Sequence, residues 1–266
     1  MLKRSEARVI VLFLLAFGLH QAGIYVIGIN GSFGWFLSLT YVAAALITVL
    51  FVRKQHSQFS QHGFLLASGA GRQLAMAVFF GFVYVFILIF LPGAISGFDA
   101  LPGSSLSLNT FLTGGSILLA GIASETVFRG YVQTELEADH GFYVAVVAVS
   151  VLFTLYMFPI ASYWTGSLTD LIGGMIPFLA ESVFLCFFFK ETKTLLCPMA
   201  FATTVGLLMT FTPLEALSSD YSLAFSFVTY LVLIPVMQSF VADVRHQGER
   251  RDDTAMVDSE EDDEED

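Results

Sequence analysis

The chain has 266 residues, of which 56% are hydrophobic and only 13% are charged. Its mean hydropathy is +0.74, whereas about a quarter of the residues in soluble domains are charged, so this composition excludes a soluble domain. Nearly all of the net charge of −11 comes from ten acidic residues between Asp252 and Asp266. The rest of the chain is nearly neutral and offers no basic surface for nucleic acid.

Long apolar windows with few charges predict transmembrane helices. Eight follow one another along the chain, at about 9–29, 34–52, 73–96, 110–131, 142–163, 170–189, 194–213 and 221–242. The predicted fold class is therefore all-α, a polytopic transmembrane helix bundle of about eight spans. The polar connection at 53–72 contains several large apolar residues and is typical of an interfacial amphipathic stretch.

The positions of the basic residues orient this arrangement. Eleven of the twelve fall on one side of an eight-span bundle: Lys3, Arg4, Arg8, Arg53, Lys54, Arg72, Lys190, Lys193, Arg245, Arg250 and Arg251. Positive residues mark the cytoplasmic side of a membrane. We therefore expect a multi-pass protein of the cell membrane with both termini in the cytoplasm.

Two domains are expected, a transmembrane domain at 1–246 and a disordered acidic tail at 247–266, since one block of like charge without aromatic residues does not fold. The tail either keeps the protein solvated or binds cations or a partner. The two cysteines, Cys186 and Cys197, lie in apolar stretches and exclude a disulfide framework. No spacing supplies the three protein ligands of a hydrolytic metal, and no cofactor is expected.

Three ionisable residues lie within the predicted spans. Such groups are costly in a bilayer and normally face the bundle interior, where they have a function. Glu125 and Arg129 are four residues apart, which places them on one helix face within ion-pair reach. Glu181 is either a second partner for Arg129 or a protonated carboxyl that is hydrogen-bonded to a neighbour. A Glu–Arg pair of this kind can be a structural clamp as well as a catalytic group.

The segment around this pair, SETVFRGYVQTEL at 124–136, resembles the first motif of the CPBP family, the CAAX proteases and bacteriocin-processing intramembrane proteases. FTLYM at 153–157 and TKTLLCP at 192–198 resemble two further motifs of that family, in the same order. The resemblance covers about 110–210. It implies an intramembrane endopeptidase, a hydrolase with a cavity that opens to the cytoplasm. In the family scheme a Glu activates water with the help of a His, and a second His and an Asn stabilise the oxyanion.

The chain departs from the family at each of these four positions. The first Glu of the motif is Ser124, the two His positions are Met157 and Ala202, and the Asn position is Gly206. Glu125, the second Glu of the motif, is retained. The histidines of the chain do not replace the missing ones, because His56, His62 and His246 lie in loops or the tail, His140 at a span edge and His20 halfway along the first span.

The prediction is therefore a degenerate family member, a pseudoenzyme that binds or escorts a membrane partner. That partner is a membrane protein, a prenylated or apolar peptide, or a lipid, and Glu125 and Arg129 are structural. Two alternatives remain open: an active endopeptidase with Glu125 as general base, assisted by Glu181, and a small transporter. Small residues such as Ala202 and Gly206 also serve close helix packing. If the resemblance holds, Glu125, Met157, Ala202 and Gly206 should line one cavity.

Overall fold

A computed structural model describes residues 3–29, 34–54, 59, 61–64, 70–96, 108–164, 168–210 and 226–242. All regular secondary structure in these ranges is helical, as the predicted fold class requires. In chain order the helices are α1 (Arg4–Ile29), α2 (Gly34–Lys54), α3 (Ala70–Ser96), α4 (Leu108–Glu125), η2 (Thr126–Gln133), α5 (Thr134–His140), α6 (Phe142–Trp164), α7 (Leu168–Thr192) and α8 (Leu196–Thr210). A final apolar helix covers Ser226–Ala242. The acidic tail lies outside the described residues.

A helical segment lies at each of the eight predicted positions. Within the described residues, three segments are long and apolar enough to cross a membrane, namely Arg4–Val26, Trp35–Lys54 and Ala70–Leu88. Shorter apolar helices lie at Phe142–Met157, Leu196–Thr210 and Ser226–Ala242. The fourth position differs most from expectation. There α4, η2 and α5 follow one another without interruption to His140, because the helix continues into a polar segment that an apolar window does not include.

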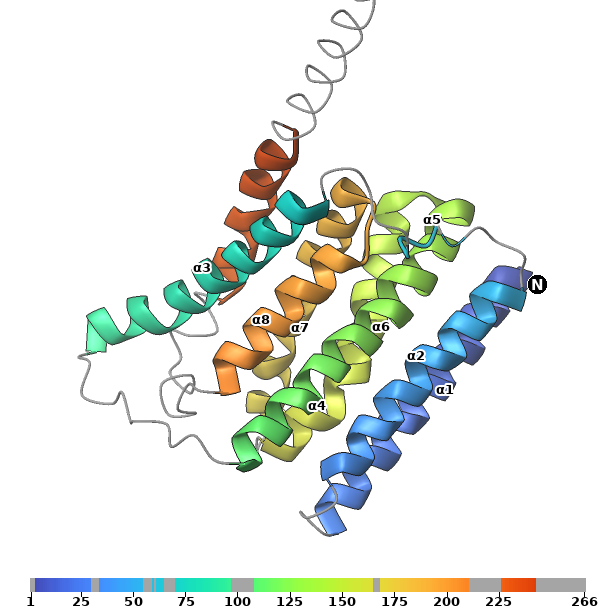
Figure 1. Cartoon of the computed structure of the whole chain (residues 1–266), viewed down its shortest axis with the longest axis horizontal. Coiled ribbons are helices and arrows are strands. Elements are labelled where there is room, and N and C mark those ends of the chain that lie inside the picture. The colour runs from blue at the N-terminus through green and yellow to red at the C-terminus, as the bar shows by residue number, and fades with distance from the viewer. Residues whose placement is uncertain are drawn as a thin grey trace, which may run out of the picture.

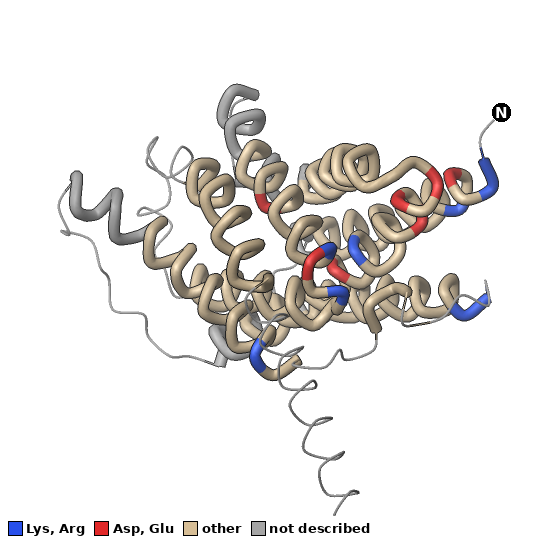
Figure 2. Tube along the Cα trace, turned by 90° about the horizontal axis from the view of Figure 1, so that it is seen from above, with Lys and Arg blue, Asp and Glu red and all other residues tan. Residues whose placement is uncertain are grey.

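The helices form a bundle in which α1 and α2 lie together on one side (Figure 1). The helices α4, α6, α7 and α8 occupy the centre, and α3 packs against α8 on the far side. Charged residues are few along the helices (Figure 2). Large apolar side chains instead face outwards, as with Phe79 and Phe86, which are each 61% exposed. An outer surface of this kind is suited to lipid rather than to water.

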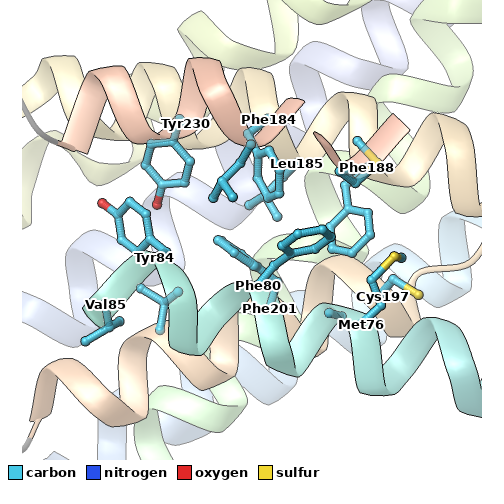
Figure 3. Packing of buried hydrophobic residues seen from close by; sticks show 14 of the residues in the cluster. Met76, Phe80, Tyr84, Val85, Phe184, Leu185, Phe188, Cys197, Phe201 and Tyr230 are labelled. Atoms are coloured by element: carbon cyan, nitrogen blue, oxygen red, sulfur yellow. The ribbon is translucent and has the colours of Figure 1, made fainter. Parts of the chain in front are cut away.

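An aromatic core joins α3, α7, α8 and the final helix (Figure 3). The rings of Tyr84 and Tyr230 stack with centroids 4.4 Å apart, and the Tyr84 hydroxyl lies 2.6 Å from the hydroxyl of Ser226. Phe184 packs on Phe201 at 4.8 Å between centroids. The Phe-rich stretches of the sequence therefore divide into buried residues that hold helices together and exposed residues on the outer surface.

Ion pairs bring α1, α5 and α7 together at one end of the bundle. Arg8 of α1 lies 3.3 Å from Glu135, and His140 lies 3.0 Å from Glu6. Lys190, near the end of α7, pairs with Glu137. The basic residues at the start of α1 and the end of α7 thus share one end, which is the arrangement that the charge pattern predicts.

Candidate functional site

The motif around Glu125 and Arg129 lies where α4 gives way to the π-helix η2. All eight residues of η2 are buried, including the Arg129 side chain. A π-helical turn widens the backbone spiral and occurs often at functional sites. Across this junction, Nη1 of Arg129 donates to Oε1 of Glu125 at 3.0 Å.

The guanidinium of Arg129 ties this turn to the neighbouring helices. Its Nη2 donates to the carbonyl oxygen of Ser182 at 3.2 Å and to the Ser182 hydroxyl at 3.0 Å. Its carbon Cζ lies 4.7 Å from the centre of the Phe153 ring of α6. Arg129 therefore connects α4, α6 and α7 from a position with no exposed surface.

Glu181 does not take the place of Glu125 as the ion-pair partner of Arg129. Among the described residues, the ion pair of Arg129 within 4.0 Å is the one with Glu125. Glu181 lies close enough for its charge to interact with those of Arg129 and Glu125. It is partly exposed and faces a cavity.

This cavity has a volume of about 400 Å³ and lies between α2, α4, α6, α7 and α8. The positions singled out by the family resemblance all line it: Ser124, Glu125, Met157, Ala202 and Gly206, together with Glu181. The rest of the wall is mainly apolar, with Leu37, Ile117, Phe153, Phe178 and Val205 among its residues. Segments far apart in the sequence thus converge on one space.

The substituted positions supply little chemistry to this cavity. The Ser124 hydroxyl donates back to the Gly121 carbonyl at 3.2 Å, within its own helix. Gly206 lines the cavity and also permits close helix packing, since a Cβ at Gly206 would stand 2.4 Å from Ile117 of α4. Gly206 therefore lies in the cavity wall, as a former site residue would, and it also allows α4 and α8 to pack closely.

Three residues behind or in the wall were not predicted from the sequence. His20 of α1 is buried and stacks on Tyr156 with centroids 4.3 Å apart, and Tyr41 lies 5.7 Å from it. Both tyrosines line the cavity. Neither ring nitrogen of His20 has a hydrogen-bond partner in the described part of the chain. The only signal in the sequence is a histidine halfway along an apolar span.

His62 lies in the connection between α2 and α3, as predicted, but its side chain contacts η2. It is buried, and its Nδ1 donates to the carbonyl oxygen of Gly130 in η2 at 2.6 Å. The carbonyl oxygen of Gly63 accepts the backbone N–H of Leu195 at 2.9 Å. The connection between α2 and α3 was predicted to be an interfacial amphipathic stretch. At residues 61–64 it contacts Gly130 of η2 and Leu195, which precedes α8.

We expect His20→Phe to stabilise the protein. Phe keeps the ring that stacks on Tyr156 and removes two buried polar atoms that have no partner among the described residues. Such unsatisfied atoms cost about 1–3 kcal/mol. His62→Phe is the matched control and should lower stability, because it removes the hydrogen bond to Gly130. Thermal unfolding in detergent measures both. A lower unfolding temperature for His20→Phe would show that His20 has a polar partner.

The side chains at the family positions in the wall can be compared with the groups that peptide hydrolysis uses. A general base needs a positioned proton acceptor, and the oxyanion of peptide hydrolysis needs preorganised donors. Glu125 supplies a carboxylate, one oxygen of which is bound by Arg129. Met157, Ala202 and Gly206 supply no side-chain donor. No group of three His, Cys, Asp or Glu residues suited to a metal occurs in the described ranges.

The region that supplies most of the cavity wall is similar to a known protein family. A family model described as Type II CAAX prenyl endopeptidase Rce1-like matches residues 106–208. The match confirms the resemblance to the CPBP family over this region of the chain. Comparisons with curated proteins and with solved structures give no match.

Proposed function

We propose that this protein is a catalytically degenerate CPBP-family member that binds an apolar segment of a membrane partner. The partner is a membrane protein, a prenylated or apolar peptide, or a lipid tail. One observation supports this above all. The four family positions for catalytic polar residues line one cavity and carry Ser124, Met157, Ala202 and Gly206.

The energetics of the site agree with binding without cleavage. Arg129 compensates the charge of Glu125 and uses its other amino group to hold Ser182 of α7. A pair used in this way fixes helix positions. The apolar wall then supplies favourable burial, about 25 cal/mol per Å² of apolar surface removed from water.

The alternative function is an active endopeptidase with Glu125 as general base. One observation favours it, since Glu125 lines the cavity and its Oε2 accepts no hydrogen bond within the described part of the chain. Glu181 lies in the same wall and is the group that would assist. The oxyanion donors would then be backbone groups.

We further infer eight spans in the cell membrane, with both termini in the cytoplasm. The inference rests on the helical segments at the eight predicted positions and on the shared end of the basic residues of α1 and α7. In this arrangement the acidic tail is cytoplasmic.

Filling the cavity tests the binding function. Ala202→Phe places a ring in the cavity, and we expect it to weaken binding of a farnesylated peptide about tenfold or more, which is about 1.4 kcal/mol. Val147→Phe adds a ring to an exposed position of α6 and should leave binding unchanged. Equilibrium binding to the reconstituted protein measures both variants. Equal affinity of Ala202→Phe and wild type would contradict the proposal.

A further inference from the structure

The cavity wall is acidic, although the site contains an arginine. Among the described lining residues, the charged ones are Glu125 and Glu181. Arg129 does not line the cavity. Its guanidinium lies behind Glu125, where it is bound to Oε1 of that residue and to Ser182. A molecule in the cavity therefore meets carboxyl groups and not the guanidinium.

One of these carboxyl oxygens accepts no hydrogen bond within the described residues. Oε2 of Glu125 is buried and has no hydrogen-bond partner in the part of the chain that the structure describes. A buried acceptor without a donor costs about 1–3 kcal/mol, and more when it is charged. In the described part of the chain, the guanidinium near these two carboxyl groups is that of Arg129, and its ion pair is with Glu125. Both facts indicate a ligand that brings an N–H donor and a positive charge.

The remaining wall indicates what such a donor is attached to. Leu37, Ile117, Phe153, Phe178 and Val205 surround the space with apolar groups. A volume of about 400 Å³ is within the range of small-molecule sites, about 300–1,000 Å³. A bare inorganic cation would leave this apolar space empty, whereas an aliphatic chain fills it.

We propose that the cavity binds an aliphatic ammonium, a cationic amphiphile whose N–H groups donate to Oε2 of Glu125 and to the Glu181 carboxylate. Its chain lies along the apolar wall. This inference rests on the proposed binding function and names the chemistry of the bound head group. Charge-assisted hydrogen bonds are about twice as strong as neutral ones, so the ammonium binds more tightly than an alcohol of the same chain. A carboxylate of that length is repelled.

The test compares three probes with one chain, namely dodecylammonium, dodecanol and dodecanoate. The full-length protein is reconstituted in lipid nanodiscs at neutral pH, and binding of each labelled probe is measured after subtraction of binding to empty nanodiscs. We expect dodecylammonium to bind about tenfold more tightly than dodecanol, in line with about 1.4 kcal/mol for one charge-assisted contact. Dodecanoate should bind least.

Two variants test whether the preference for dodecylammonium over dodecanol depends on the carboxyl groups of the cavity. Glu181→Gln and Glu125→Gln should each abolish the preference for the ammonium while dodecanol still binds. Glu191→Gln makes the same change on α7 outside the cavity and should keep the preference. Equal binding of alcohol and ammonium, or a preference that survives both cavity variants, would overturn this inference and leave the binding function intact. If no probe binds above empty nanodiscs, this inference is wrong, and binding of the farnesylated peptide then decides separately whether the proposed function stands.

Discussion

Arg129→Met should destabilise the protein more than any other single change in the central helices. Met approximates the length of the side chain but leaves Glu125 buried without its counter-charge, and it removes both contacts to Ser182. Breaking a buried pair in this way costs about 3–5 kcal/mol. We expect little folded Arg129→Met protein after extraction, measured as the monodisperse fraction in size-exclusion chromatography and as the unfolding temperature.

The double variant Arg129→Met/Glu125→Gln separates charge from packing. Removing the second charge should restore a large part of the lost stability, because the unpaired carboxylate is the main penalty. A double variant as unstable as the single one would mean that Arg129 acts mainly through Ser182 and Phe153. Arg8→Met is a suitable surface control, since the Arg8–Glu135 pair is partly exposed and such pairs contribute at most about 1 kcal/mol.

Gly206→Ala is the second change with a large expected effect. The added Cβ would stand 2.4 Å from Cγ2 of Ile117, so α4 and α8 must move apart or Ile117 must change its rotamer. Overpacking of this kind costs about 1–3 kcal/mol. The variant should unfold at a lower temperature and should also bind cavity ligands less well, because Gly206 lies in the wall.

Gly115→Ala is the matched control for this prediction. It lies on α4 and has open space where a Cβ would be placed. Ala is favoured over Gly within helices by about 0.5–1 kcal/mol, so this variant should be neutral or slightly more stable. If Gly206→Ala and Gly115→Ala have the same unfolding temperature, α4 and α8 do not approach each other closely at Gly206.

The positions of the helices could be predicted from the sequence because hydrophobicity and helix length are local properties. A helical segment lies at each of the eight predicted positions, and the i, i+4 spacing correctly suggested that Glu125 and Arg129 touch. The shared cavity of Met157, Ala202 and Gly206 followed from the resemblance, since no periodicity within one helix relates α6 to α8. The number of membrane spans and the orientation stay predictions.

Other parts of the site depend on tertiary contacts that no local pattern encodes. The π-helix η2 falls within a segment predicted as one continuous span, and its residues Arg129 and Gly130 contact Ser182 and His62 of other segments. The stacking of His20 on Tyr156 joins α1 to α6, which are far apart in the sequence. His62 lies in a polar connection, where burial could not be expected from composition.

The most direct test of the central claim is peptide cleavage by the purified, reconstituted protein. Farnesylated C-terminal peptides and short membrane-helix peptides are incubated with wild type and with Glu125→Gln, and the products are analysed by mass spectrometry. The proposed function predicts intact peptides with both proteins while both remain folded. Cleavage by wild type that is lost in Glu125→Gln would contradict it and would make Glu125 the general base of an active endopeptidase.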